Sequence, residues 1–231
     1  SDVYKRQGER AVFFERSTAP EPVFLDAHKQ LIRDAFMLHV NGRHRQFMRS
    51  AMALAQEVGT IISLDGGAQR YDEEMKSITE ASHIVIVARD YAEKYTGATD
   101  LEEACRIIHE RGALIAGVTD GANGSYFVWP DGTFYRCQAF PQEHVVDTTG
   151  AGDSFHGAFL SKLVTLLSEL AAVEWGASST YAIDLLQHCG HSDLEKAAIF
   201  ASAVAALNTQ GIGGRSPLPS LQVVHKLMGL E

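Results

Sequence analysis

Several features are scarce in this chain of 231 residues, and each shortage excludes a class of protein. Cysteine occurs only as Cys105, Cys137 and Cys189, an odd and widely spaced set that argues against a disulfide framework and favours a reducing compartment. Basic residues are outnumbered, because 20 Lys and Arg face 29 Asp and Glu and give a net charge of −9. Without a basic run or basic helix face, we expect no binding to nucleic acid or to an anionic membrane.

Long apolar runs are also lacking. The strongest, AAIFASAVAAL at 197–207, is too short to span a bilayer and indicates a buried helix. No signal peptide opens the chain, so the cytoplasm is the expected location. Residues 1–7 (SDVYKRQ) resemble a translated sequencing adapter, and the chain lacks an initiator methionine. We interpret 1–7 as a non-native tail, with a natural polar tail as the alternative, and 8–231 as the C-terminal portion of a longer domain.

The chain does contain an alternation of short apolar runs and helical patterns. Val- and Ile-rich runs without polar interruptions are typical of parallel strands that are covered on both faces. Two aromatic runs flank Pro130-Asp131-Gly132 and predict a hairpin over 124–140. The pattern indicates an α/β fold with a mostly parallel sheet. We expect further strands at 11–17, 36–40, 60–65, 83–88, 113–119 and 144–147, and helices at 44–59, 72–80, 100–111, 193–208 and 219–228.

One segment, at about 168–190, is polar and irregular in its middle and is interpreted as an insertion between two helices. It ends in HCGH at 188–191, which has some of the residue types of a metal site. Zinc needs four convergent ligands, so a solvated loop is the preferred reading of this short motif.

The stretch DTTGAGDSFHGAF puts an aspartate straight after Gly-Ala-Gly, where a helix of small and apolar residues begins. A helix N-terminus leaves its first N–H groups unpaired and carries partial positive charge, so it attracts anions. Gly150 and Gly152 lack a Cβ and Ala151 adds little bulk, which lets a ligand approach the backbone. An ionised Asp153 beside a bound phosphate is placed to accept a proton from an attacking hydroxyl. The stretch therefore predicts an anion hole followed by a general base, as phosphoryl transfer requires.

Helix chemistry alone allows other interpretations of this stretch. In one, Asp153 is an ordinary N-cap and the glycines form a tight turn. In another, Gly150, Gly152 and Gly157 imitate a dinucleotide fingerprint, but their spacing is wrong and no acidic residue ends a following strand. A P-loop enzyme is excluded because GxxxxGK[ST] occurs nowhere in the chain.

DTTGAGDSFHGAF resembles the C-terminal signature of the ribokinase-like (PfkB) carbohydrate kinases, in particular fructokinase- and ketohexokinase-like members. The resemblance implies a ribokinase-like three-layer sandwich with part of a small β lid, and an ATP-dependent enzyme that phosphorylates a sugar hydroxyl. A nucleoside kinase of the same superfamily and a non-catalytic nucleotide-binding protein are the alternatives. Supporting segments follow in family order over nearly all of residues 8–231: LHVNGRH (38–44), LDGGAQR (64–70), AEKYTG (92–97), VTDGANG (118–124) and FASAVAAL to GGRSPLP (200–219).

The resemblance also implies roles for individual residues of the signature. Asp153 matches the catalytic base, and the backbone amides of Gly150, Ala151 and Gly152 match the anion hole around the transferred phosphate. Asp147 and Thr149 match positions whose oxygens hold a monovalent cation, usually K⁺, in some members. Hard oxygen ligands suit such a cation; a strand-end turn is the alternative reading of the pair.

Other positions match the nucleotide and sugar sites of the family. Thr119, Gly121 and Gly124 correspond to the nucleotide site, although the glycines equally suit a hairpin-entry turn. Gly214 lies in a loop that resembles the one closing over the nucleotide. Three further positions follow strand ends, where open α/β sheets bind ligands, and correspond to sugar contacts, with ordinary turn residues as the alternative: Asn41, Arg43 and Asp65.

Two departures from the family pattern stand out. Many members carry Asn-x-x-Glu before the helix that corresponds to AEKYTG, where it organises the magnesium–phosphate region; Ala88 and Tyr91 occupy those positions here. The N-terminal portion of the family, with its Gly-Gly-Asn sugar motif, is not present in the chain. The implied ligands are a sugar and ATP with Mg²⁺, and a homodimer is left open for the full-length protein. We expect the isolated chain to be weakly active or inactive.

Overall fold

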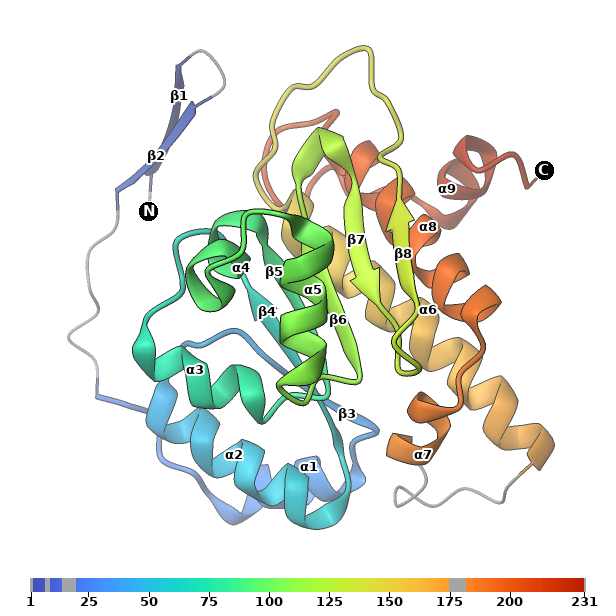
Figure 1. Cartoon of the computed structure of the whole chain (residues 1–231). Helices are drawn as coiled ribbons and strands as arrows, with labels where there is room; N and C mark the ends of the chain where they lie inside the picture. Colours follow the sequence, from blue (N-terminus) through green and yellow to red (C-terminus); the bar gives the residue numbers. More distant parts are fainter. Residues whose placement is uncertain (1, 7–8, 14–19, 175–181, 231) are drawn as a thin grey trace.

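The computed structural model describes residues 2–6, 9–13, 20–174 and 182–230. Its centre is one six-stranded sheet in the order β3-β4-β5-β6-β7-β8 (Figure 1). The first four strands are parallel, and β7 and β8 form an antiparallel hairpin on β6, as the sequence predicts. The strands are β3 (Met37–Val40), β4 (Ile61–Gly66), β5 (Ile84–Ala88), β6 (Ile115–Thr119), β7 (Ser125–Val128) and β8 (Phe134–Cys137).

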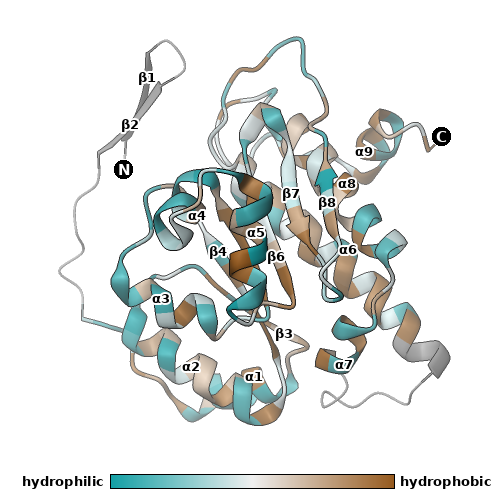
Figure 2. Ribbon diagram, in the orientation of Figure 1, coloured by the Kyte–Doolittle hydropathy of each residue, from teal (hydrophilic) through white to brown (hydrophobic). Residues whose placement is uncertain are grey.

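Helices cover both faces of this sheet and make a three-layer sandwich (Figure 1). One layer contains α1 (Asp26–Asp34), α2 (Arg45–Val58), α3 (Glu73–Glu80), α4 (Arg89–Thr96) and α5 (Leu101–Glu110). The other contains α6 (Ala151–Glu174), α7 (Ala182–Gln187), α8 (His191–Asn208) and α9 (Leu221–Leu227). Figure 2 shows hydrophilic and hydrophobic residues interleaved along α2, α3 and α5, as expected of helices that lie between sheet and solvent.

Alternation along the strands decides which helix layer each side chain meets. On β4, Ile62 and Leu64 belong to the core under α2–α5, whereas Ile61 belongs to the core under α6 and α8. The odd-numbered residues Ser63 and Asp65 therefore face α6. His39 pairs with Ser63 in the parallel register of β3 and β4, so it faces the same way. This alternation brings polar side chains of two strands to the N-terminal end of α6.

Local signals account for several helix boundaries. The carboxylate of Asp72 caps α3 by accepting the N–H groups of Glu74 and Met75. Gly59 ends α2 with φ +76°, a left-handed conformation that glycine adopts without steric strain. Both boundaries agree with the predicted helices at 44–59 and 72–80.

The predicted strand at 144–147 is wrong. These residues form no strand, and the side chains of Val145 and Val146 are 58% and 52% exposed. The N–H groups of Val146 and Asp147 both donate to the carbonyl of Thr209, just after α8, so this segment pairs with a helix end instead of a sheet edge. A short apolar run forms a strand only where a neighbouring strand completes its hydrogen bonds, which explains why the predicted strand is not observed.

Two more expectations are only partly met. The strand expected at 11–17 is observed as β2 (Glu9–Phe13), which pairs antiparallel with β1 (Asp2–Arg6) in a separate ribbon; 14–19 lie outside the described residues. The pairing includes part of segment 1–7, whose origin stays a prediction. The expected insertion at 168–190 begins inside α6, contains α7, and has its middle, 175–181, outside the described residues.

The HCGH segment lies between α7 and α8 and is not fully solvated. Cys189 is buried, and the rings of His188 and His191 bond to the carbonyl of Asp184 and the carboxylate of Asp131 respectively. Within the described ranges, no group of three or more His, Cys, Asp or Glu side chains is arranged to hold a metal. Within the same ranges, no helix is long and apolar enough to cross a membrane.

Candidate active site

The site is built around the start of α6, at the carboxyl ends of the parallel strands. The helix begins at Ala151, as the sequence predicts, and Gly150 before it has φ +77°. Asp153 is the third residue of the helix and its side chain is exposed. An N-cap residue precedes the first helical residue, so Asp153 is not the cap of α6. Its carboxylate is free to meet a ligand in the field of the helix N-terminus.

The amides of this turn are only partly engaged. The N–H of Ala151 points to the carbonyl of Thr148 at 3.3 Å. Among the residues that the structure describes, no carbonyl or side chain accepts from the N–H groups of Gly150 and Gly152. Two unpaired amides at a helix N-terminus are suited to binding an anion.

The turn packs against the C-terminal loop that carries Gly214. A Cβ built on Gly150 would lie 2.4 Å from the Cα of Gly214, so the two backbones touch at a distance that excludes any side chain. The structure thus brings together two positions that are 64 residues apart, one expected at the phosphate and one at the nucleotide.

Asp147 and Thr149 join the same two loops. The carboxylate of Asp147 accepts the N–H of Thr149 at 2.9 Å and the N–H of Gly213 at 3.0 Å. The carbonyl of Thr149 accepts the side-chain amide of Asn208 at 3.3 Å. These bonds favour a loop-closing role for Asp147, and a monovalent cation at this pair stays a prediction.

Asp65 lies at the end of β4 on the face toward α6, with its side chain 15% exposed. Burial raises the pKa of Asp65 to about 6; the guanidinium of Arg70 opposes this shift, and the negative charge of Asp153 adds to it. The distance from Arg70 Nη1 to Asp65 Oδ2 is 3.9 Å, too long for a hydrogen bond. Asp65 follows Ser63 on the same face of β4, and the Ser63 hydroxyl lies 2.9 Å from His156 Nε2, one turn after Asp153, so the two carboxylates lie on the same side of the sheet.

Two histidines that sequence reasoning missed lie beside these carboxylates. His156 follows Asp153 by one helical turn, is 2% exposed, and lies 2.9 Å from the hydroxyl of Ser63 through Nε2. His39 packs its ring against that of His156, with centroids 4.7 Å apart and planes at 63°. The sequence spacing could have identified the strand residues of this cluster. On a strand, residues two apart face the same side, and His39 and Ser63 stand two residues before the predicted site residues Asn41 and Asp65.

The segment after β3 carries the other two expected sugar contacts. The Asn41 side-chain carbonyl accepts the N–H of Arg43 at 3.3 Å, which is the turn that the sequence offered as the alternative. Gly42 between them has φ +78°, and a Cβ there would lie 2.8 Å from the sulfur of Met75. Asn41 and Arg43 share the sheet edge with Asp65, and their contact with a sugar stays a prediction.

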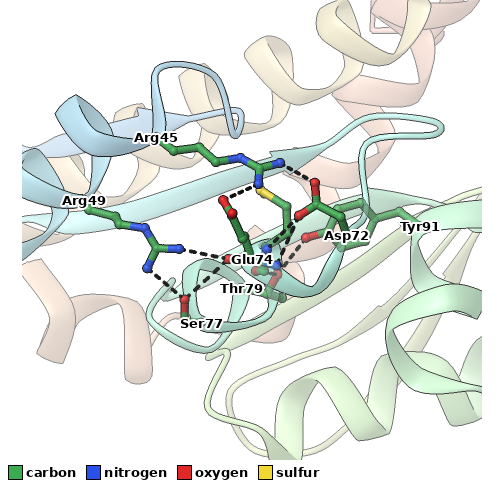
Figure 3. Close-up of polar contacts among 8 residues, drawn as sticks. Arg45, Arg49, Asp72, Glu74, Ser77, Thr79 and Tyr91 are labelled. Atoms are coloured by element: carbon green, nitrogen blue, oxygen red, sulfur yellow. Dashed lines mark hydrogen bonds and ion pairs between the residues drawn. The ribbon is translucent and has the colours of Figure 1, made fainter. Parts of the chain in front are cut away.

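A network of ion pairs joins the helices that follow these two loops (Figure 3). Arg45, at the start of α2, pairs with Asp72 and Glu74 at the start of α3. Arg49, one turn later, donates to the hydroxyl of Ser77 and to the carbonyl of Glu74. Because α2 follows the Asn41–Arg43 turn and α3 follows the Asp65 loop, the network fixes the two loops relative to each other.

The β6–β7 turn holds the expected nucleotide residues. Thr119 ends β6, the single 3₁₀ turn Gly121–Asn123 follows, and Gly124 precedes β7. Asp120 between them accepts from Arg89 Nη1 at 2.6 Å and from the amide of Asn123 at 3.0 Å. In Figure 1 this turn lies at the same end of the sheet as the loop before α6 and the loop between α8 and α9. Nucleotide contact by Thr119, Gly121, Gly124 and Gly214 stays a prediction.

The residues at the Asn-x-x-Glu positions do not supply oxygens to the site. Tyr91 is fully buried, and its hydroxyl lies 2.7 Å from the hydroxyl of Thr79, a buried residue of α3. Burial raises the pKa of Tyr91 to about 12, so it stays neutral. Ala88 has no polar side chain. These two residues do not fit a protein-held Mg²⁺ at this place.

Comparison with known proteins gives a consistent result. Residues 3–221 match the family described as "pfkB family carbohydrate kinase". The chain is 37% identical over 89 residues to a cytidine kinase of Thermococcus kodakarensis, covering 38% of this chain and 31% of that protein. It is 29% identical over 191 residues to fructokinase-2 of Solanum habrochaites, covering 74% of this chain and 57% of that protein.

Among solved structures, Arabidopsis thaliana ribokinase complexed with ribose and ATP superposes with a TM-score of 0.68 at 21% identity. The match covers 97% of this chain and 67% of the ribokinase. At that identity the likeness establishes the ribokinase-like fold alone.

Proposed function

Since the chain belongs to the pfkB family of carbohydrate kinases, we propose that it carries the catalytic part of an ATP-dependent kinase that phosphorylates a sugar hydroxyl. The chain spans 57% of the fructokinase and 31% of the cytidine kinase to which it is similar, so the activity of the whole protein belongs to this proposal. The observation that carries it is the start of α6, where an exposed carboxylate follows two amides that have no acceptor among the residues that the structure describes.

In the proposed reaction, the Asp153 carboxylate accepts the proton of the sugar hydroxyl as its oxygen attacks the γ-phosphorus of ATP. The bond from that phosphorus to the β,γ-bridging oxygen breaks, and ADP leaves with the electron pair. The N–H groups at 150–152 stabilise the negative charge on the transferred group. The touching loops at Gly150 and Gly214 support placing the nucleotide phosphates beside this contact, within reach of both loops.

The metal ions take no step in this scheme. Mg²⁺ is proposed to arrive with ATP, because Ala88 and Tyr91 provide no ligands. K⁺ at Asp147 and Thr149, a homodimer and a cytoplasmic location remain predictions, as does the division of the chain at residue 8.

A nucleoside kinase is the second candidate, and the similarity to a cytidine kinase favours it. A panel of fructose, ribose, 2-keto-3-deoxygluconate, adenosine and cytidine with ATP separates the two classes by the acceptor that is phosphorylated. ATP consumption without any acceptor would favour a non-catalytic nucleotide-binding protein.

The general base is tested with Asp153→Asn. We expect the rate of phosphate transfer to fall by at least about 10²-fold, the usual contribution of a general base, while the Kd for ATP changes little. Glu169→Gln is the matched control, because it removes one negative charge from an exposed position far along the same helix. An unchanged kcat in Asp153→Asn would refute the role of Asp153.

A further inference from the structure

His39 lies beside the proposed active site, although the sequence analysis did not identify it as a site residue. It lies on β3 opposite Ser63, on the sheet face that meets α6, and its side chain is exposed at the edge of the layer. The charge of Asp153 acts on His39, as it does on Asp65. His39 from β3 and Ser63 from β4 both contact His156, which lies one helical turn after Asp153 on α6, so polar groups of the three elements meet next to the proposed general base.

The ring of His39 is supported from behind. His156 packs edge to face against it and is itself held by the Ser63 hydroxyl. Burial, with a smaller contribution from His39, lowers the pKa of His156 to about 3, so His156 is neutral at physiological pH. This buried polar pair lies directly behind the His39 ring, which we interpret as a support for the orientation of that ring.

We propose that His39 is a further acceptor-binding residue, whose imidazole hydrogen-bonds to a hydroxyl of the substrate adjacent to the one that Asp153 deprotonates. The inference rests on the proposed kinase function. His156 and Ser63 are positioning residues that fix the orientation of the His39 ring. No proton leaves His39 in the reaction.

The chemistry of a neutral imidazole suits this role. One ring nitrogen donates and the other accepts, which matches a hydroxyl that is both donor and acceptor. Although the His39 side chain reaches the surface, the atoms packed around its ring remove part of its hydration and lower its pKa, and the charge of Asp153 partly offsets the shift, so the ring is neutral near pH 7. His39 packs against His156 from α6, lies opposite Ser63 on β4, and experiences the charge of Asp153. A neutral ring leaves the negative charge of Asp153 available for the hydroxyl proton.

The first test is kinetic, with His39→Leu and His39→Gln. Loss of one hydrogen bond, about 1.4 kcal/mol, raises the KM for the acceptor about tenfold in His39→Leu, and kcat and the KM for ATP change far less. His39→Gln, which keeps a donor and an acceptor, restores most of the loss. An unchanged acceptor KM, or an equal rise in the KM for ATP, would overturn the proposal, and urea midpoints check that both variants fold.

The second test uses NMR of the imidazole resonances in the 231-residue chain. Acceptor sugars shift the His39 resonance, and Asp153→Asn lowers the pKa of His39 because the charge that raises it is lost. His83 is the control, since it lies at the opposite end of the strands, where Nδ1 accepts the Ile62 N–H, and burial alone lowers its pKa.

The two tests separate this inference from the kinase proposal. If a sugar is phosphorylated but does not shift the His39 resonance, the proposed role of His39 is refuted and the kinase proposal is kept. If a sugar shifts the His39 resonance but Asp153→Asn leaves the rate of its phosphorylation unchanged, the contact of His39 is supported and the proposed role of Asp153 is refuted. If Asp153→Asn leaves the pKa of His39 unchanged, the two side chains do not share one space and the inference is wrong.

Discussion

Gly121 and Gly124 lie three residues apart in one turn, yet the structure restricts them differently. Gly124 has φ +94°, and a Cβ there would lie 2.1 Å from the carbonyl oxygen of Cys137 on the neighbouring strand. Gly121 has φ +54° and open space around it. Close approach of β7 and β8 therefore requires glycine at 124, whereas at 121 the backbone angle alone disfavours a side chain.

Alanine substitutions measure this difference. We expect Gly124→Ala to lower the free energy of unfolding by about 3 kcal/mol, the sum of left-handed strain and overpacking, and Gly121→Ala by about 1 kcal/mol. Urea denaturation followed by fluorescence compares the two, with Gly121→Ala as the matched control. Equal losses would contradict the close approach to Cys137.

Asp65 makes stability depend on pH. Its pKa rises from 3.8 in the unfolded chain to about 6 in the folded protein, so between these values the folded state binds more protons. The contribution of Asp65 to stability is therefore largest below pH 4, falls by about 3 kcal/mol at most as pH rises to about 6, and is constant above.

Asp65→Asn removes this dependence. We expect the variant to unfold at higher urea than the wild type at pH 7.5, and at nearly the same urea concentration at pH 4. Titration of His156 affects both proteins alike and cancels in the comparison. A stability difference that does not change with pH would show that the Asp65 carboxyl is not the titrating group.

Among the elements, the strands were the most predictable part of the fold. The run TIISLD gives β4 because uninterrupted apolar residues suit a strand covered by helices on both sides. The same rule failed at 144–147, where the apolar residues flank the site and no strand lies beside them. The pattern of apolar residues indicates which segments are buried. Whether a neighbouring strand is there to accept and donate the backbone hydrogen bonds depends on the whole fold.

The candidate site also has a part that the sequence predicted and a part that it did not. The start of α6 was predictable because glycines, an acid and a helix lie together in one segment. Sequence spacing gave no distance between segments, so it did not reveal that His39 packs on His156 or that Gly150 touches Gly214. Those contacts depend on the register of β3 with β4 and on how the loops at the sheet end pack.

The link between α4 and the β6–β7 turn offers a test at the scale of elements. Arg89 at the start of α4 binds Asp120, whose side chain is 14% exposed, and Glu93. If the turn binds nucleotide, we expect Arg89→Met to weaken ATP binding several-fold by releasing Asp120, with little loss of unfolding free energy because Arg89 is exposed to solvent.

Calorimetric titration with ATP measures this effect. Arg106→Met is the matched control, because Arg106 is equally exposed and pairs with Glu102 on α5, away from the turn. Weaker ATP binding in both variants would indicate a general loss of stability and would remove the specific role of Arg89.

For the whole molecule, the sheet distributes stability unevenly. β4 and β5 are bonded on both sides and almost completely buried, whereas β3 pairs only with β4 among the described residues and keeps His39 exposed. A strand bonded on one side opens without unfolding the rest of the domain.

Hydrogen exchange tests this gradient. We expect the slowest amides of β3 to exchange at least about tenfold faster than those of β5, because β3 opens locally and β5 exchanges through global unfolding. Equal protection of the two strands would mean that β3 is secured by contacts other than those to β4.

The touching backbones of Gly150 and Gly214 have a mechanical consequence. A displacement of one loop toward the other is therefore opposed directly by backbone contact. An insertion or a bulky residue in the C-terminal loop would therefore tilt the first turn of α6 and redirect Asp153, even though the altered residue never meets the reactants.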